Sequence, residues 1–432
     1  MIRLFDFDKV PTSEILTRGI LAEEDVDAAV DVVLSAVRTE GDAALIRFEK
    51  QFDGADLNGL FVTEEELDAA QAQVDPELLE TLRQAAENIR AFHSRQTHND
   101  FVLTDKPGVV MGQRYTPIES VGVCVPGTPV AFPSTVLMDV IPAKIAGVRE
   151  IIMATPPAPD GTIAPAALAA AKIAGVTKIL KCGGAQAVAA MAYGTKSVPK
   201  VDKIVGPGGV YVAAAKRKVF GLVSIDMIAG PSEILVLADG KSDPRWVAAD
   251  LLSQAEHDKL ASAVLVTDSR ALAEAVRDEL ELQLETLPRR EVARASIDHN
   301  GKIILTDSLE KAAEAANRIA PEHLELCVDE PFALLPLIRN AGSIFLGRNA
   351  PEALGDYFAG PNHTLPTSGT ARFSSPLGVD DFVKRSSFLY YTRQALQSVS
   401  ARIQGFARQE GLEAHARAIA VRDEQNGKGS AQ

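Results

Sequence analysis

Histidines with a polar neighbour gather in the second half of this 432-residue chain. Only seven histidines occur, and five of them lie after residue 250 beside a carboxylate, an amide or a helix signal. In LLSQAEHD, Gln254 precedes His257 by three positions. In IAPEHLEL, Glu322 directly precedes His323. Farther on, the chain adds Asp356, His363 and His415. Such groups ligate metal ions and transfer protons, so the pattern predicts an enzyme with a metal ion and an acid/base pair.

The pair Gln254 and His257 falls in a segment with the signals of a helix. Asp243 is a favoured N-cap residue, Pro244 suits the first helical position, and apolar residues follow at helical spacing through residue 264. A spacing of three then places the two side chains on one face, where both can bind one ion. A solvated helix face explains the same pair equally well.

The pair Glu322 and His323 follows a second predicted helix, which Ser308 caps and Pro321 ends. The pair then opens a strand. Neighbouring strand residues point to opposite faces, but at the mouth of a strand both side chains can line a cleft. A surface glutamate beside a half-buried histidine is the more common arrangement, so both interpretations stay open.

The composition favours a globular protein that acts on a small molecule. With 46% hydrophobic and 24% charged residues, the chain can bury cores for about two to three domains. Its net charge of −14 and its lack of a Lys/Arg block argue against nucleic acid or an anionic membrane surface as partner. Three cysteines without CxxC spacing argue against a disulfide framework. No apolar run approaches the ~18 to 20 residues of a membrane span, and we expect a cytoplasmic protein.

Hydrophobic periodicity divides the chain into helical ends and two α/β lobes. Residues 12–52 and 76–98 show helical spacing, and near residue 108 β-branched alternation replaces it. Short β runs then alternate with Ala-rich helices to about residue 240, and a second stretch with the same alternation ends near residue 375. This alternation specifies parallel sheets covered by helices on both faces. The prediction is an α/β fold with two Rossmann-like, doubly wound lobes and helical N- and C-terminal extensions.

These signals predict four segments. Residues 1–20 form an N-terminal helical extension. The first α/β lobe, residues 21–120 with 235–376, carries the metal and acid/base residues. The second α/β lobe, residues 121–234, binds the nucleotide. Residues 377–432 form a C-terminal helical segment whose polar tail, NGKGSAQ, is expected to be disordered.

The second lobe contains glycines in a place that suits phosphate binding. The usual GxGxxG is absent, since CGGAQA and VGPGGV both fail its spacing. Gly206, Gly208 and Gly209 nevertheless lie between a predicted strand and an Ala-rich helix, where free amides and the helix dipole can receive a phosphate. Glycines at such a place more often only make a tight turn, so that interpretation stays open.

A series of longer motifs resembles the histidinol dehydrogenase family. In order along about residues 15–420, they are VPG, FPSTVLMDVIPAKIAGV, GGAQAVAAMAYGT, VDKIVGPG, SIDMIAGPSE, LLSQAEHD, IAPEHLEL, LGDYFAGPNHTLPT and EGLEAH. Several such motifs in series are very specific. The resemblance implies a zinc- and NAD-dependent enzyme that oxidises L-histidinol through L-histidinal to L-histidine in histidine biosynthesis.

The resemblance also implies residue roles. One zinc ion per subunit is bound by Gln254, His257, Asp356 and His415. These four ligands contact the substrate together with Ser232, His323, His363 and Glu410. His323 is the general base that removes the hydroxyl proton, and Glu322 activates the water that hydrates the aldehyde. The NAD contacts are Cys124, Gln186 and Gly209. The C-terminal segment of a homodimer carries Glu410 and His415 into the partner's site.

The chain departs from the family's pattern where the nucleotide binds. Cys124 stands in place of Tyr, Thr128 in place of the second Gly of VPGG, and Gly209 in place of Asn, whereas Gln186 is retained. An aromatic hydroxyl and an amide are lost, and at about 0.5 to 1.5 kcal/mol per hydrogen bond we expect weaker NAD binding. Backbone amides at Gly208 and Gly209 can compensate.

Two other activities stay open. The altered stretch from Cys124 to Thr128 is the reason to consider a paralogue that oxidises another polar alcohol. A zinc hydrolase, with Glu322 activating water and no nucleotide, fits less well, because two helix-covered parallel lobes with glycine turns suit a dinucleotide.

Overall fold

The computed structural model describes residues 1–18, 23–127 and 131–424, which fall into two compact units. Unit 1 comprises Met1–Thr97 and Ile118–Phe382, and unit 2 comprises His98–Pro117 and the described part of Val383–Gln432. Thr128 and the polar tail NGKGSAQ lie outside the described residues. Among those residues, no helix combines the length and apolarity that a membrane crossing requires.

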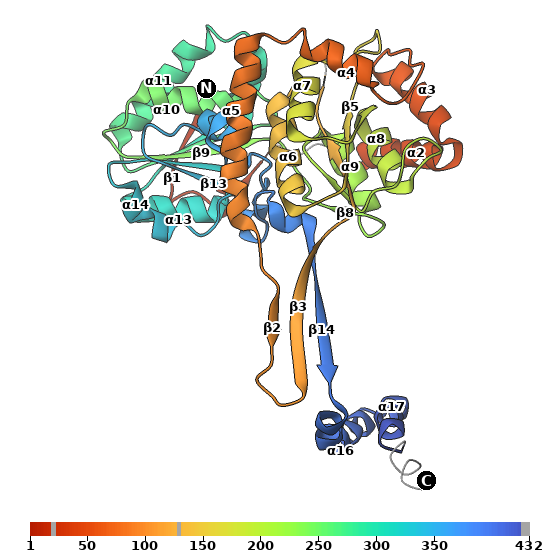
Figure 1. Cartoon of the computed structure of the whole chain (residues 1–432). Helices are drawn as coiled ribbons and strands as arrows, with labels where there is room; N and C mark the ends of the chain where they lie inside the picture. Colours follow the sequence, from red (N-terminus) through yellow and green to blue (C-terminus); the bar gives the residue numbers. More distant parts are fainter. Residues whose placement is uncertain (19–22, 128–130, 425–432) are drawn as a thin grey trace, which may run out of the picture. The chain divides into compact units, whose positions relative to one another are not determined.

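The first sheet of unit 1 has six parallel strands in the order β1-β11-β10-β9-β12-β13. Its strands are β1 (Arg3–Asp6), β9 (Glu233–Ala238), β10 (Ser262–Thr267), β11 (Lys302–Leu305), β12 (His323–Cys327) and β13 (Ser343–Leu346). Apolar cores cover both faces of this sheet, as expected because its strands are continuous hydrophobic runs in the sequence. One core contains residues of α10 (Pro244–Ala255), α11 (Arg270–Leu284) and α12 (Arg290–His299), and the other contains residues of α13 (Leu309–Ile319). In Figure 1, α10 and α11 lie on one side of these strands and α13 lies on the other.

The second sheet of unit 1 has five parallel strands in the order β6-β5-β4-β7-β8. They are β4 (Ser120–Cys124), β5 (Glu150–Thr155), β6 (Lys178–Lys181), β7 (Lys203–Val205) and β8 (Ser224–Ile225). The flanking helices are α6 (Pro133–Ala146) and α7 (Pro165–Ala174) in one core and α8 (Gly184–Tyr193) and α9 (Val210–Val219) in the other. The prediction of two doubly wound parallel lobes is therefore confirmed.

The N-terminal third differs from the expected division of the chain. Residues 1–20 are not purely helical, because β1 precedes the short helix α1 (Thr12–Leu16) and pairs in parallel with β11. The next helices, expected in the first lobe, pack on the second sheet instead. They are α2 (Glu23–Glu40), α3 (Asp42–Phe52), α4 (Glu64–Gln71) and α5 (Pro76–His93). Periodicity predicts that a helix has an apolar face, but it does not say which sheet that face covers.

Unit 2 contains an antiparallel sheet and two helices. The strand order is β14-β3-β2, and α16 packs against α17. The elements are β2 (Phe101–Leu103), β3 (Val109–Pro117), β14 (Val383–Tyr391), α16 (Arg393–Gln409) and α17 (Glu413–Glu424). The expected helical segment 377–432 therefore begins with a 3-10 turn (Val379–Phe382) and a nine-residue strand. That strand forms because all nine residues pair with β3, a partner far away in sequence.

Candidate functional site

The acid/base pair lies at the amino ends of β9 and β12, which are neighbours in the first sheet. The Nδ1 atom of His323 is 2.9 Å from the carbonyl oxygen of Glu233, and the Oε2 atom of Glu322 accepts the Glu233 N–H at 2.8 Å. Because a carbonyl oxygen can only accept, Nδ1 carries a proton and Nε2 is the free ring nitrogen in the neutral tautomer. The parallel pairing of these strands thus fixes both side chains.

The free nitrogen of His323 faces a carboxylate. Its Nε2 atom lies 3.6 Å from Oδ1 of Asp356, which is too far for a hydrogen bond, and it has no hydrogen-bond partner among the described residues. Burial opposes the charged imidazolium, but the nearby carboxylates of Glu322 and Asp356 raise the pKa of His323 to about 10. Burial raises the pKa of Glu322 to about 7. The surroundings of Glu322 and His323 therefore shift the pKa values of both groups, as is common for groups that transfer protons.

Gln254 and His257 lie at the end of α10. The predicted N-cap Asp243 is confirmed, since its side chain accepts the N–H of Arg245, but the helix ends at Ala255 rather than near residue 264. His257 lies in the turn that follows, and its N–H donates to the Gln254 carbonyl at 3.1 Å. This turn keeps the two residues adjacent although His257 is not helical.

The side-chain amide of Gln254 is buried without a hydrogen-bond partner among the described residues. Its side chain is 1% exposed, and neither Oε1 nor Nε2 has a hydrogen-bond partner within the described parts of the chain. Burying an amide unpartnered is costly, and its Oε1 atom can bind a metal ion. Burial lowers the pKa values of His257 and His363, and the charge of the Asp356 carboxylate opposes this lowering in both. Asp356 is therefore close enough to act on both histidines.

Asp356 lies in the helical turn Gly355–Ala359, directly after α15 (Glu352–Leu354). Nδ1 of His363 is 3.0 Å from the Asp356 carbonyl oxygen. Burial opposes ionisation of the Asp356 carboxyl group, but interactions with His323 and His363 hold its pKa below its usual range. An ionised carboxylate, an amide and imidazole nitrogens form a donor set that suits zinc.

Glu352 is a site residue that the sequence analysis missed. It is 3% exposed, and one of its carboxylate oxygens lies within 4.8 Å of ligand atoms of His323 and Asp356. Burial, followed by the Asp356 carboxylate, raises the pKa of Glu352 to about 8. Its spacing of four residues before Asp356 is the signal that could have identified it, because side chains at that spacing meet on a helical turn.

Ser232, an expected substrate contact, directly precedes Glu233, whose main chain binds Glu322 and His323. Ser232 is half-buried in the turn that leads into β9, and its carbonyl oxygen accepts the N–H of Ser262 at 3.0 Å. The two remaining expected residues, Glu410 and His415, are exposed in unit 2, at the end of α16 and in α17. Unit 1 therefore brings together His257, Glu322, His323, Asp356 and His363, and the turn after α10 keeps Gln254 next to His257.

Two helices of the second sheet have a glycine as N-cap residue, and the N–H of one of these glycines, Gly183, donates to Oε1 of Glu49 at 3.2 Å. Gly183 precedes α8 and Gly209 precedes α9, and neither N-cap has a side-chain hydrogen bond. Gly206 has φ +102°, and a Cβ there would lie 2.3 Å from the carbonyl oxygen of Cys124. The backbone thus needs glycine at 206 for a tight turn, while the helix N-termini retain the donors that a dinucleotide phosphate would use.

The expected cofactor contacts differ in accessibility. Gly209 is exposed, whereas Cys124 is buried and burial raises the pKa of its thiol to about 12. Gln186 is also buried, and its Nε2 atom donates to Oε1 of Glu49 at 2.9 Å. With Nε2 held in this way, Gln186 presents a fixed amide orientation. The NAD contacts of these residues stay predictions.

Comparisons with known proteins agree on one family. The family model described as histidinol dehydrogenase matches residues 16–423. A histidinol dehydrogenase of Halalkalibacterium halodurans is 57% identical over 91% of this chain and 93% of its own length. That of Syntrophotalea carbinolica is 54% identical over 98% and 99%. The crystal structure of histidinol dehydrogenase from Elizabethkingia anophelis has a TM-score of 0.93 and 39% identity, covering 99% of both chains. The chain belongs to the histidinol dehydrogenase family.

Proposed function

We propose that this enzyme oxidises L-histidinol through L-histidinal to L-histidine, with NAD as electron acceptor and one zinc ion per subunit. The observation that carries the proposal is the cluster in unit 1, where the free Nε2 of His323 faces Asp356 and the Asp356 carboxylate acts on His257, which the turn after α10 keeps next to Gln254. Family membership supports the same substrate and reaction.

The metal ligands of the proposal are Gln254, His257 and Asp356 of one subunit and a His415. When bound, zinc holds the nitrogen atoms of the substrate and fixes its alcohol carbon for reaction. The buried amide of Gln254 supports this assignment, because the protein leaves both of its polar atoms without another described partner.

His323 accepts the hydroxyl proton at Nε2, because its Nδ1 proton is engaged with the Glu233 carbonyl. The neighbouring carboxylates favour the imidazolium form and raise the pKa of His323 to about 10. With Asp356 bound to a divalent cation, one of those negative charges would be offset, and the neutral ring that a base requires would be favoured.

Glu322 activates water for hydration of the aldehyde. Its pKa of about 7 keeps a substantial carboxylate fraction at neutral pH, and the Glu233 N–H holds its Oε2 atom in place. NAD accepts one hydride in each of the two oxidations, so a complete turnover consumes two NAD molecules. The N-termini of α8 and α9, with Gln186 and Gly209, are the proposed dinucleotide contacts.

We infer a cytoplasmic homodimer with shared active sites. In it, the Glu410 and His415 of each subunit complete the site of the other. Their exposure in unit 2 supports this arrangement. The same unit also exposes large apolar side chains, including Phe388, Leu389 and Phe406, which an interface would bury. The three cysteines are free and buried, in keeping with a reducing compartment.

The test is an assay of purified enzyme with zinc, NAD and L-histidinol, followed by NADH absorbance. We expect two NADH per L-histidinol, a severe loss of rate for His323→Asn, and a slower reaction with L-histidinal for Glu322→Gln. NADH formation only with another polar alcohol would replace the substrate assignment. No NADH with any alcohol would leave a hydrolase and contradict the proposal.

A further inference from the structure

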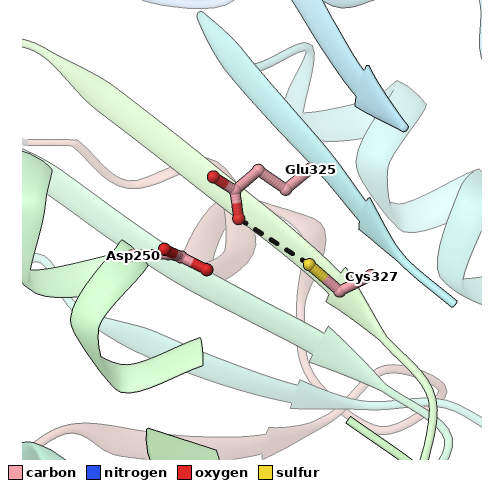
Figure 2. Close-up of side chains that lie close together, drawn as sticks. All are labelled: Asp250, Glu325 and Cys327. Carbon is pink, nitrogen blue, oxygen red and sulfur yellow. Dashed lines mark hydrogen bonds between the residues drawn. The ribbon is translucent and has the colours of Figure 1, made fainter. Parts of the chain in front are cut away.

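A second carboxyl cluster lies beside the site and has no role in the proposed reaction. Figure 2 shows Asp250 of α10 next to Glu325 and Cys327 of β12. One oxygen of each carboxyl group and the Sγ atom of Cys327 lie within 4.8 Å of one another, with Sγ 3.8 Å from Oε2 of Glu325. Glu325 is fully buried and Asp250 is half-buried.

The two carboxyl groups of this cluster lie close together in buried surroundings. Burial raises the pKa of Asp250, and burial together with the charge of Asp250 raises the pKa of Glu325 well above its usual range. A carboxylic acid beside a carboxylate forms a strong hydrogen bond, whereas two carboxylates at this distance repel each other.

Glu325 uses its other oxygen to hold the segment that carries Asp356. Its Oε1 atom accepts the backbone N–H of Glu352 at 2.7 Å. This N–H belongs to the first residue of α15, whose N-cap residue, Pro351, provides no side-chain cap. Because Asp356 follows one helical turn later, the contact fixes where that turn begins.

The side chain of Glu352 is held from the same direction. The hydroxyl group of Ser253 donates to the Asp250 carbonyl oxygen at 2.7 Å, and its Oγ atom lies 3.0 Å from Oε2 of Glu352. Residues of α10 and β12 thus hold both the backbone and the carboxylate of Glu352. The same two elements carry Gln254 and His323, so one framework sets the positions of all three parts of the site.

We propose that Glu325 is a positioning residue that places Asp356 for metal binding, and that Asp250 holds Glu325 in the required orientation. The proposal rests on the assignment of Asp356 as a metal ligand in the proposed function. Neither residue touches the ion or the substrate. Partners of this kind typically change metal affinity or activity by about 10- to 100-fold when removed.

The test compares substitutions of Glu325 that keep or lose the bond to Glu352. In Glu325→Gln, the amide oxygen still accepts the Glu352 N–H and the NH2 group donates to Asp250. In Glu325→Asp, the shorter side chain no longer reaches. Glu325→Leu removes the acceptor completely. Cys327→Ser is the matched control, because it changes the cluster without changing the bond to Glu352.

Two readouts require no substrate. One is the zinc affinity of the metal-free dimer, and the other is the visible spectrum of the cobalt-substituted dimer, which reports ligand geometry. We expect Glu325→Asp and Glu325→Leu to weaken zinc binding about 10- to 100-fold and to alter the cobalt spectrum. We expect Glu325→Gln and Cys327→Ser to match the original protein in both. In steady state, the KM for NAD stays unchanged while kcat falls in the Asp and Leu variants.

Several outcomes would overturn the positioning role. One is a lower melting temperature for Glu325→Asp with unchanged zinc affinity and cobalt spectrum, which would make the contact merely structural. Another is a second equivalent of zinc that Glu325→Gln abolishes, which would make the cluster a metal site. Absence of zinc binding in the original protein would also refute it. Zinc binding without L-histidinol oxidation would refute the proposed function alone, because the metal readouts still decide the role of Glu325.

Discussion

Substitution of Gly209 by asparagine should strengthen NAD binding in this enzyme. Gly209 is the exposed N-cap of α9, with φ −64° and ψ 178°, and a Cβ placed there would meet no atom within 4 Å. An asparagine therefore fits without strain. Its Oδ1 atom can accept a free N–H of the first turn, and its NH2 group then points outward as a donor for the cofactor.

The size of the effect follows from one gained hydrogen bond. At about 0.5 to 1.5 kcal/mol, the dissociation constant and KM for NAD should fall about 2- to 13-fold. The change at the N-cap adds only a few tenths of a kcal/mol to stability, so the melting temperature should rise by about 1 °C or less. NAD titration by calorimetry and steady-state kinetics at saturating L-histidinol measure both quantities, and kcat should stay constant.

Gly59→Asn is the matched control for Gly209→Asn. Gly59 is exposed in the loop between α3 and α4, and a Cβ there also meets nothing within 4 Å. This variant should leave NAD binding unchanged. An unchanged NAD dissociation constant in Gly209→Asn, accompanied by a higher melting temperature, would show that the new side chain caps the helix but does not contact the cofactor. That result would refute the reasoning.

Three further predictions concern the metal, the second lobe and the dimer. Gln254→Leu should abolish tight zinc binding yet stabilise the metal-free protein by about 1 kcal/mol, since it removes a buried unpartnered amide; zinc titration and urea unfolding with a chelator measure this. In the second lobe, Lys216 and Asp226 form a buried ion pair. Asp226→Asn leaves Lys216 charged and buried, so it should lower the free energy of unfolding measured in urea by about 3 to 5 kcal/mol. Lys216→Met in the same chain should recover part of this loss. The proposed dimer is tested by mixing two inactive variants, His323→Asn and His415→Ala, and unfolding and refolding them together. The mixture should regain about a quarter of the original activity, because random pairing makes half of the dimers mixed and each mixed dimer has one intact shared site out of two. No recovery would place each site within one subunit.

Local signals in the sequence were sufficient to predict most helices and strands of unit 1. The side chains of Asp243 and Ser308 cap the helices that they were expected to begin, and β12 starts at His323 as expected. The failures involve distant partners. β1 exists because it pairs with β11, about 300 residues later, and β14 exists because it pairs with β3. A pattern read in a short window contains no information about such a partner.

The candidate site was predicted residue by residue, but its assembly was not. The motifs supplied Gln254, His323 and Asp356, each from a different element. Their convergence depends on which strands are neighbours, and the order β9-β12-β13 is not readable from the chain. Glu325 was missed for the same reason. A glutamate in a strand predicts a solvent-facing position, whereas here the partner of Glu325 is a backbone N–H 27 residues away.

The pairing of β12 with β9 decides the chemistry of the site as well as its position. Glu233 holds Glu322 with its N–H and His323 with its carbonyl oxygen, and its own carboxylate binds Arg18 at 2.7 Å and the N–H of Ser368 at 2.8 Å. A one-residue slip in register would turn His323 to the other face of the sheet and withdraw both backbone contacts. Since these contacts come from main-chain atoms, no single side-chain substitution at Glu233 removes them directly. The proton on Nδ1, and therefore the free Nε2 that faces Asp356, is a consequence of strand register.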